Sequence, residues 1–302
     1  MVHKYTNGNY TVEIDDITGT KTRYTEGNDF MSEFPESIDC TITYKCSNNI
    51  CEFCYAGCTE NGKHADLNSD YINNVFIPSL HPYTELALNG NDLTHPQLID
   101  FLIKLKSHNI IANLTVNQKH FMQNLGLLHD LYNKNLIHGL GVSLVTPSQE
   151  FITEIKKFPS AVIHVIAGIF SQEDIKALRY HNLKLLILGY KRKGRGNNYY
   201  VDNAEVINSN IDYLKKILPY LIRMGSFSLI SFDNLAIEQL AIRLMMSEEK
   251  WEEFYMGKDG EFTMYIDLVN NTYARDSLVK QNYPIDNKTV PEMFKVIKEN
   301  NS

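Results

Sequence analysis

Four cysteines lie close together in this chain, within the segment KCSNNICEFCYAGC. They are Cys46, Cys51, Cys54 and Cys58, and the only other cysteine is Cys40. Thiolates spaced a few residues apart on a loop can converge on one soft metal ion or cluster. A disulfide needs no such clustering, and in a cytosol it would be reduced. The spacing therefore predicts a metal-binding loop.

The elements that would position this loop alternate along the chain. Short apolar, β-rich segments predict strands at residues 38–43, 83–88, 110–116, 138–145, 161–168, 183–189 and 227–232. Segments with apolar residues at helical spacing predict helices at 95–108, 118–134, 171–181 and 204–222. Such alternation indicates an α/β fold with a parallel sheet, either a barrel or a doubly wound sheet. In both, active sites lie at the carboxyl ends of the strands, and the cysteine segment follows the first strand.

The two ends of the chain depart from this alternation. Residues 9–25 predict an N-terminal hairpin with a turn at Gly19. Near the other end, the segment WEEFYMGKDGEFTMYID predicts strand-like segments around a KDG turn, followed by a helix near residues 291–300. We expect a single domain (1–302) made of an N-terminal hairpin region (1–34), a barrel core (35–247) and a C-terminal capping extension (248–302).

Composition limits the classes of partner. The 302 residues are 43% hydrophobic, and 36 acidic against 29 basic residues give a net charge of -7. This balance argues against a broad surface for long nucleic acid, so we expect a small substrate. The sequence opens with no signal segment and contains no run of about 18 apolar residues. We therefore expect a cytoplasmic protein without a membrane span.

The cysteine loop resembles that of the radical SAM superfamily, in which three cysteines follow the first barrel strand and an aromatic residue precedes the third. Cys46, Cys51 and Cys54 occupy these places, with Phe53 as the aromatic residue. The first two cysteines are separated by four residues here, where the family usually has three. The resemblance implies a partial (β/α)6 TIM-type barrel. It also implies that the three thiolates hold a 4Fe-4S cluster and leave one iron for S-adenosylmethionine (SAM).

The resemblance extends to segments at the ends of the second, fourth and fifth strands that would bind SAM. Their residues are Asn89, Gly90, Asn91, Asp92, Ser143, Ile166 and Gly168. The first four stand where the family has a Gly-Gly-Glu-Pro motif that orients the SAM amino group, although the glutamate is absent. The serine would meet the ribose or carboxylate, and the last two would run beside the adenine. A helix cap and a strand-end hydrogen bond also explain the turn and the serine.

Two later segments favour substrate binding at the same edge of the sheet. The first contains Lys191, Arg192, Lys193 and Arg195, and the second contains Asp233 and Asn234. Basic side chains among glycines, in an acidic chain, are suited to an anion such as phosphate. A carboxylate beside an amide is suited to a purine-like edge. The simpler interpretations are a solvated loop for the basic segment and helix capping for the second.

Within the superfamily, the whole chain looks most similar to the queuine lyases, which release the 7-deazaguanine base queuine from queuosine 5′-phosphate for salvage into tRNA. This resemblance implies a lyase that uses SAM and a 4Fe-4S cluster. It also implies an electron donor such as flavodoxin or ferredoxin, and no membrane or large nucleic acid as a partner. The adenosyl radical would abstract a ribose hydrogen, and the basic loop would receive the phosphate.

Three alternatives stay open. A structural zinc knuckle would use all four clustered cysteines in a binding module without SAM chemistry. Cys58 is an alternative cluster ligand, because it follows Cys51 and Cys54 at a spacing of two and then three residues. A radical SAM enzyme that modifies a peptide is another catalytic possibility, with the N-terminal hairpin as a strand edge. Cys40, within a predicted strand, is expected to be a core residue.

Overall fold

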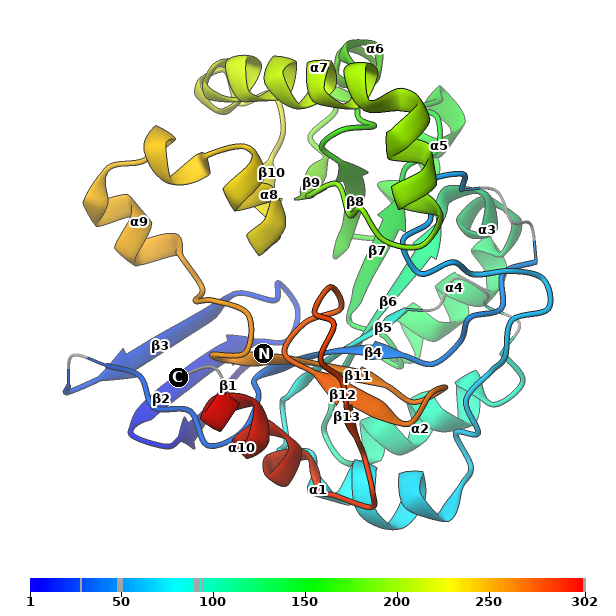
Figure 1. Cartoon of the computed structure of the whole chain (residues 1–302), viewed down its shortest axis with the longest axis vertical. Coiled ribbons are helices and arrows are strands. Elements are labelled where there is room, and N and C mark those ends of the chain that lie inside the picture. The colour runs from blue at the N-terminus through cyan, green and yellow to red at the C-terminus, as the bar shows by residue number, and fades with distance from the viewer. Residues whose placement is uncertain (28, 48–50, 90–92, 94, 301–302) are drawn as a thin grey trace.

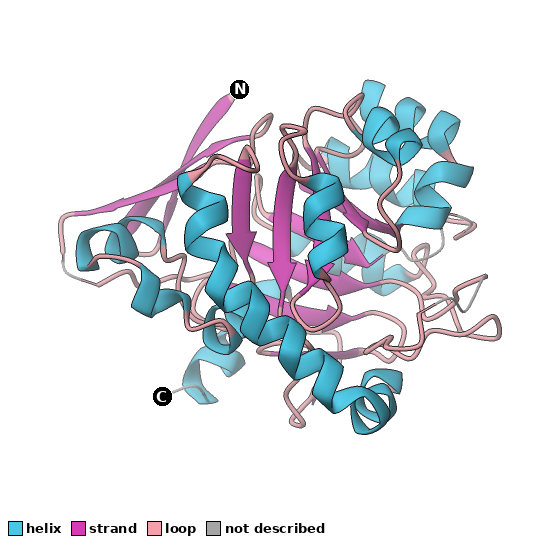
Figure 2. Cartoon of the chain, turned by 90° about the horizontal axis from the view of Figure 1, so that it is seen from above, coloured by secondary structure: helices cyan, strands magenta, loops and turns pink. Residues whose placement is uncertain are grey.

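The computed structural model describes residues 1–27, 29–47, 51–89, 93 and 95–300. The chain opens with a small antiparallel sheet of β1 (Val2–Asn7), β2 (Tyr10–Asp15) and β3 (Lys21–Thr25), which lies at one side of the molecule (Figures 1 and 2). The predicted hairpin corresponds to β2 and β3. The sequence did not reveal β1 because it is mostly polar, and backbone pairing with β2 along its whole length holds it in place.

The other strands form one large sheet. They are β4 (Ser37–Thr41), β5 (Glu85–Asn89), β6 (Ile111–Asn117), β7 (Gly139–Ser143), β8 (Ala161–Ile166), β9 (Lys184–Leu188), β10 (Leu229–Phe232), β11 (Thr263–Asp267), β12 (Thr272–Ala274) and β13 (Tyr283–Pro284). Strands β4 to β10 are parallel and adjacent in chain order, and they are the strands that the sequence predicted. β11 adds in parallel beside β4, and β12 and β13 follow antiparallel.

Helices connect the parallel strands and end the chain. They are η1 (Ile72–Phe76), α1 (Ile77–Ser79), α2 (Leu98–Ser107), α3 (Gln118–Gln123), α4 (Leu125–Asn133), α5 (Gln149–Ile155), α6 (Gln172–Leu178), α7 (Arg195–Arg223), α8 (Asn234–Gln239), η2 (Ile242–Met245), α9 (Glu248–Phe254) and α10 (Val290–Asn300). The predicted helices correspond to α2, α3 with α4, α6, α7 and α10. Among the described residues, no helix combines the length and the apolar content needed to cross a bilayer.

The strand order determines where the connecting helices lie. From β4 to β10, each crossover leads to the next strand in the same direction. Right-handed crossovers then place all connecting helices on one face of the sheet. Figure 1 shows α2 to α7 along the outside of these strands. This winding excludes the doubly wound alternative, and the sheet is open, with β10 and β13 as its edges.

The two faces of the parallel strands differ in character. Side chains that face the helices form the core, in which Ile38 and Cys40 of β4 are fully buried. This burial confirms Cys40 as a core residue, and it raises the pKa of its thiol. The opposite face carries apolar side chains on β8 and β9 and polar side chains that reach solvent, among them Asp39, Thr115 and His164. This face without connecting helices is therefore available for binding.

The C-terminal extension differs from its prediction. The strand expected at WEEFY is wrong, because this segment forms α9. Ser247 Oγ accepts a hydrogen bond from Lys250 N (3.4 Å), and glutamates occupy the first helical turn. The hairpin consists of β11 and β12, and the Asp267 carboxylate stabilises its turn with two backbone hydrogen bonds of 3.0 Å. Because β11 pairs with β4, the extension is part of the main sheet.

Candidate active site

The cysteine loop leaves the carboxyl end of β4 and is closed at its base by backbone hydrogen bonds. Tyr44 N donates to Lys63 O (2.9 Å), and Cys46 N donates to Thr59 O (2.9 Å). Within the loop, positions 48–50 lie outside the described residues. The cysteines therefore project from the sheet edge at which parallel α/β folds place their active sites.

The thiols of the loop affect one another. Cys46, Cys51 and Cys54 are partly exposed, Cys58 is buried, and none of them forms a disulfide. A hydrogen bond from the Cys58 thiol, aided by the Arg195 guanidinium, lowers the pKa of Cys54 to about 5 against the effect of burial. Burial, and then the nearby Cys54 and Cys46, raise the pKa of Cys51 to about 11. The three predicted ligands are thus near enough to repel one another as thiolates.

The chemistry of these donors fits an iron-sulfur cluster. Thiolate is the form of cysteine that binds metal, and the low pKa of Cys54 supplies one at neutral pH. Positive cluster iron would also relieve the repulsion that raises the pKa of Cys51. Within the described part of the chain, no three His, Cys, Asp or Glu side chains are arranged closely enough to hold a metal ion. Loading would therefore bring the sulfurs closer together.

Arg195, at the start of α7, holds the cysteine loop through its backbone carbonyls. The guanidinium donates to Cys51 O from Nε (3.2 Å) and Nη2 (3.1 Å), and to Cys58 O from Nη1 (2.7 Å). The backbone N of Arg195 donates to Cys54 O (3.1 Å). Gly194 has a positive φ of 55°, and a Cβ there would lie 2.5 Å from a backbone oxygen of the loop. The Arg195 side chain, which was predicted to bind an anion, therefore binds the cysteine loop.

Asn117 connects the same loop to β6. Its Nδ2 donates to Cys51 Sγ (3.5 Å), and its Oδ1 accepts from Lys119 N (2.9 Å) as the N-cap of α3. Hydrogen bonds to ligand sulfurs tune the reduction potential of a cluster. Sequence analysis missed Asn117 because an asparagine between a strand and a helix is an ordinary cap, and no sequence signal links it to Cys51.

The residues predicted to bind SAM lie at neighbouring strand ends. Asn89 ends β5 and donates from Nδ2 to Thr41 Oγ1 (3.3 Å). Ser143 ends β7, opposite His164 of β8, and Ile166 ends β8. The predicted turn also includes Gly90, Asn91 and Asp92, which lie outside the described residues. The structure thus brings Asn89, Ser143 and Ile166 to the side of the sheet where the carboxyl ends of the parallel strands lie.

Two glycines are explained by close packing. A Cβ at Gly168 would lie 2.4 Å from Ile207 Cγ2 of α7, and Gly168 O accepts from Asn210 Nδ2 (3.1 Å). A Cβ at Gly141 would lie 2.3 Å from Cε1 of His164. Gly168 thus has a packing role in addition to the predicted place beside adenine, and Gly141 makes room for the His164 ring on the helix-free face.

The helix-free face borders a recess. Burial lowers the pKa of His164 to about 4, so the ring is neutral at physiological pH. Asp39 of β4 reaches solvent, yet burial raises the pKa of its carboxyl group while Lys191 opposes the shift. Solvent contact together with strong desolvation places Asp39 in a recess rather than on a convex surface. Neither side chain has a hydrogen bond to another described residue, so both are available to a ligand.

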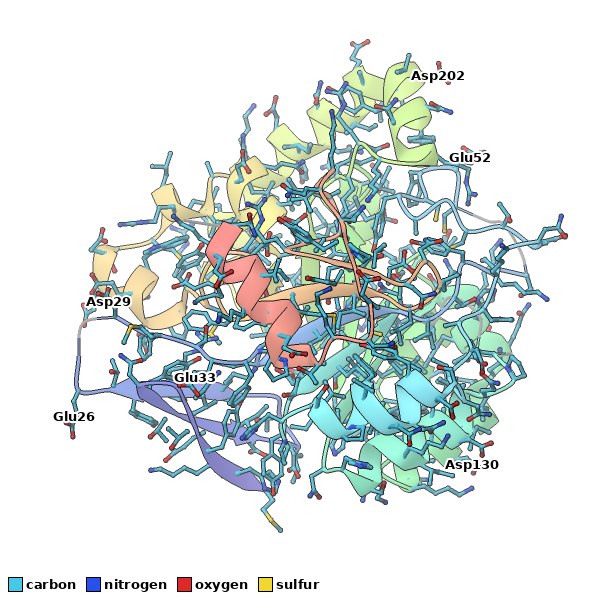
Figure 3. The ribbon with its side chains drawn as sticks, turned by 60° about the horizontal axis from the view of Figure 1, so that its bottom comes forward. Glu26, Asp29, Glu33, Glu52, Asp130 and Asp202 are labelled. Carbon is cyan, nitrogen blue, oxygen red and sulfur yellow. The ribbon has the colours of Figure 1, made fainter. Side chains whose placement is uncertain are left out.

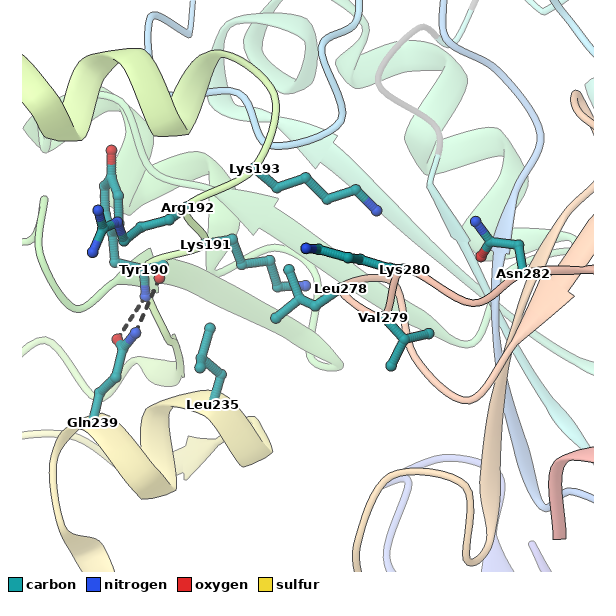
Figure 4. Close-up of a pocket in the computed structure, with 10 residues that line it drawn as sticks. All are labelled: Tyr190, Lys191, Arg192, Lys193, Leu235, Gln239, Leu278, Val279, Lys280 and Asn282. Carbon is teal, nitrogen blue, oxygen red and sulfur yellow. Dashed lines mark hydrogen bonds between the residues drawn. The ribbon is translucent and has the colours of Figure 1, made fainter. Parts of the chain in front are cut away.

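Three of the four predicted anion-binding cations border one cavity of about 590 Å³ (Figure 4). They are Lys191, Arg192 and Lys193. Lys191 Nζ donates to Ser277 Oγ (3.1 Å), and Lys193 Nζ donates to Ser277 O. Arg195 does not line the cavity, because its guanidinium is bonded to the cysteine loop. The basic segment therefore serves two neighbouring sites.

The second predicted substrate segment has a structural role. Asp233 Oδ1 accepts from Ala236 N (2.7 Å) as the N-cap of α8, and from Gly189 N (2.8 Å) after β9. The capping interpretation is thus confirmed for Asp233. Asn234 Nδ2 donates to Asp259 Oδ1 (2.7 Å). Asn234 therefore points to a carboxylate that the sequence had not indicated.

A second cavity, of about 740 Å³, lies beside Asn234. Its lining includes Trp251 and Tyr255, whose rings stack with their centroids 4.3 Å apart. Burial raises the pKa of Asp259, also a lining residue, against the hydrogen bond from Asn234. Aromatic faces beside a carboxylate and an amide suit a flat heterocycle with N–H groups. The sequence did not indicate Asp259, because KDG is typical of a plain turn.

Comparisons with known proteins support the fold. No protein-family model and no curated protein matches the chain. The structure is similar to SuiB of Streptococcus suis bound to S-adenosylmethionine, with a TM-score of 0.61 and 10% sequence identity over 97% of this chain and 86% of that chain. A second crystal structure of SuiB matches with a TM-score of 0.56 and 12% identity over the same shares. At this identity the likeness establishes the mixed α/β fold, which a SAM-binding protein shares.

Proposed function

We propose that this chain is a radical SAM enzyme that binds one 4Fe-4S cluster through Cys46, Cys51 and Cys54 and acts on a small nucleotide-like substrate. One observation carries the proposal: three partly exposed thiols project together from the loop at the carboxyl end of β4, with Cys46 and Cys54 near enough to raise the pKa of Cys51. They do so in a fold shared with a SAM-bound protein. The finer description of the sheet as a partial (β/α)6 barrel belongs to this proposal, and the one-directional strand order supports it.

The cofactors supply the difficult chemistry. When both are bound, an electron passed to the SAM sulfonium breaks a carbon-sulfur bond and gives a 5′-deoxyadenosyl radical, and flavodoxin or ferredoxin is the electron donor that we propose. The protein has to position the reactants. The three thiolates would hold the cluster, while Arg195 and Asn117 fix the loop from which they project.

The strand ends beside the loop would orient SAM. Asn89 and Ser143 offer an amide and a hydroxyl at the carboxyl ends of β5 and β7, on either side of β6, which are suited to the amino, carboxylate and ribose groups. The ring of His164 lies opposite Ser143 and is neutral. It can therefore accept or donate a hydrogen bond in the recess without adding a charge near the reacting atoms.

The two cavities support a substrate with an anionic end and a flat base. One cavity is lined by lysines and the other by stacked aromatic rings, Asp259 and Asn234. A carboxylate and an amide oxygen can accept from the N–H edge of a 7-deazaguanine. The specific reaction that we propose is release of queuine from queuosine 5′-phosphate by a cytoplasmic lyase, in the salvage of queuine for tRNA modification.

A peptide-modifying radical SAM enzyme is the second candidate. Its support is an edge strand beside the proposed site: β10 ends the main sheet, and Leu229 in it is 48% exposed. A peptide can add to such an edge through main-chain hydrogen bonds. The edges of the N-terminal sheet, β1 and β3, offer the same kind of pairing.

Anaerobic reconstitution followed by two assays tests the proposal. The protein is loaded with iron and sulfide, reduced with dithionite and given SAM, and 5′-deoxyadenosine is quantified by mass spectrometry. Queuosine 5′-phosphate is then added, and release of queuine is measured. We expect 5′-deoxyadenosine in the first assay and queuine in the second.

The two assays separate the levels of the proposal. A fully loaded cluster without 5′-deoxyadenosine would contradict the radical SAM assignment. Production of 5′-deoxyadenosine without queuine release would contradict only the specific substrate and would favour the peptide alternative. Zinc in place of iron, at one ion per chain and bound by all four clustered cysteines, would instead indicate a structural knuckle.

A further inference from the structure

We propose that Lys280 completes a binding site for a phosphate monoester together with Lys191 and Lys193. The inference rests on the proposed function and deepens it, since it names the charged group of the substrate and a residue that no sequence pattern indicated. Figure 4 shows the three lysines reaching into one cavity from two segments that are far apart in the sequence.

Hydrogen bonds tie these two segments together. Ser277 accepts from Lys191 through Oγ and from Lys193 through its carbonyl oxygen. The next residues form a defined turn, because Asp276 Oδ1 accepts from the backbone N of Leu278 (2.7 Å) and of residue 279 (3.1 Å). Lys280 follows this turn directly. Lys280 therefore follows a segment that hydrogen bonds of Ser277 and Asp276 hold in place beside the other two lysines.

The charges of the three lysines are not balanced by close carboxylates. Lys191, Lys193 and Lys280 form no ion pair within 4.0 Å in the part of the chain that the structure describes. Burial, and then the charge of Lys191, lower the pKa of Lys193. Ammonium groups held together at the cost of mutual repulsion are stabilised when an anion binds between them.

In the described part of the chain, the cavity lining contains no acidic residue, and some of the acidic excess lies on the outside of the molecule. The sequence has a net charge of -7, and Figure 3 shows acidic side chains projecting from the outside of the molecule at Glu26, Asp29, Glu33, Glu52, Asp130 and Asp202. Against this background, a cavity lined by several cations is a local reversal of charge. Such a reversal would attract an anionic substrate and distinguish this cavity from the rest of the surface.

Lys191 stays charged in this position. Burial acts to lower its pKa, but Tyr55, Asp233, Asp39 and Asp259 raise it on balance. None of these carboxylates is within ion-pair distance of the ammonium group. Lys191 therefore remains a cation at the border of the basic cavity, where it can pair with a ligand phosphate.

The rest of the lining does not compete for the anion. Gln239 Nε2 donates to Tyr190 O (3.0 Å), and its Oε1 accepts from Tyr190 N (2.8 Å), so both polar ends of this amide are occupied. Arg192 lies 4.0 Å above the Tyr200 ring and adds a further positive charge at the cavity. Three ammonium groups match the three acceptor oxygens of a phosphate monoester better than the two of a carboxylate.

Calorimetry with matched variants tests the site. Reconstituted protein is titrated with guanosine 5′-monophosphate and, separately, with guanosine, in the wild type and in the Lys280→Ala, Lys193→Ala and Lys216→Ala variants. Lys280 and Lys216 are both exposed, and neither side chain forms a hydrogen bond or ion pair with another described residue, but Lys216 lies on α7 outside the cavity. We expect the wild type to prefer the monophosphate, and each cavity variant to lose about tenfold or more in affinity for it. Lys216→Ala should bind as the wild type does.

Each other outcome overturns the inference. Equal affinity of Lys280→Ala and the wild type for the monophosphate would exclude Lys280, and equal binding of nucleoside and nucleotide by the wild type would exclude a phosphate site. A loss of SAM affinity in Lys280→Ala, with the monophosphate unaffected, would assign the cavity to the SAM carboxylate. Formation of 5′-deoxyadenosine by the same preparations shows separately whether the proposed function holds.

Discussion

The two ends of the parallel strands use charge in different ways. At the amino end, Glu36 is fully buried directly before β4 and accepts from Arg23 Nε (2.8 Å), Arg23 Nη2 (3.1 Å) and Tyr10 OH (2.6 Å). Lys21 lies 3.5 Å from Glu36 and 2.8 Å from Glu85, the first residue of β5. Every charge in this cluster has a partner, and the cluster fastens the N-terminal sheet to the main one.

The carboxyl end leaves charged and polar groups available. Lys191 and Lys280 have no ion pair among the described residues, and the side chains of Asp39 and His164 have no hydrogen bond there. A buried charge that has lost its partner destabilises a fold, so structural charges are paired, whereas ionisable groups without a partner in a concave site are candidates for ligand binding. The amino end therefore maintains the structure, and the carboxyl end is arranged for ligands.

Removing a cluster ligand should have the largest effect, and it should be confined to the carboxyl end. Cys54→Ala is expected to lose the cluster entirely, because only two of the proposed thiolates remain. Iron and sulfide per chain, measured after anaerobic reconstitution, check this. The melting temperature of the unloaded protein should stay close to that of the wild type.

Cys40→Ala is the matched control for the ligand assignment. Cys40 lies one strand position from the recess but points into the core, where it is fully buried. This variant should retain its iron while losing about 1–2 kcal/mol in the free energy of unfolding. Equal iron content in Cys54→Ala and the wild type would contradict the assignment of Cys54.

Breaking the amino-end cluster should have the opposite effect to Cys54→Ala, because it should lower stability and leave iron binding unchanged. Glu36→Gln leaves the largely buried side chain of Arg23 without its carboxylate, so the free energy of unfolding should fall by about 3–5 kcal/mol. Urea unfolding measures this loss. Glu13→Gln, which removes an exposed partner of Lys4, should cost less than about 1 kcal/mol. A small loss of unfolding free energy in Glu36→Gln would contradict the distinction between the amino and carboxyl ends of the strands.

Replacing Arg195 should weaken the cysteine loop without unfolding the protein. Arg195→Lys keeps the charge but cannot make the three guanidinium hydrogen bonds to Cys51 O and Cys58 O. We expect cluster affinity to fall by about 10–100-fold and the electron paramagnetic resonance (EPR) spectrum of the reduced cluster to change. Arg192→Lys serves as the control and should keep the cluster affinity and the EPR spectrum of the wild type. An unchanged spectrum in Arg195→Lys would exclude the positioning role.

The neutral ring of His164 should make stability depend on pH. Its pKa in the fold is about 4, below its ordinary value, so the unfolded chain takes up the proton first as the pH falls. Stability should therefore decrease from about pH 6.5 to 4, with a slope of up to about 1.4 kcal/mol per pH unit from this residue. Urea midpoints of the wild type and His164→Gln, compared at pH 7, 6 and 5, measure the difference. Parallel curves would contradict the assignment.

The sequence was sufficient for the repeating part of the fold. Strands β4 to β10 and the longer helices have clear periodicity, because each buries one apolar face. The C-terminal strand at WEEFY failed because local capping by Ser247 outweighed its aromatic content. β1 was missed because its stability comes from pairing with β2, which local propensity does not record.

The site was predictable where its residues are adjacent in the sequence. The cysteines could be recognised from their spacing alone. The partners of this loop could not, because Asn117 and Arg195 reach it from β6 and α7 through contacts that only the fold creates. Arg195 was therefore grouped with the anion-binding lysines beside it, while Lys280, far along the chain, was not.

EPR of the reduced, reconstituted protein with and without SAM tests the central claim most directly. If Cys46, Cys51 and Cys54 leave one iron open, SAM will bind there and change the spectrum of the 4Fe-4S cluster. An identical spectrum at saturating SAM would mean that the cluster has no open iron, and it would contradict the account.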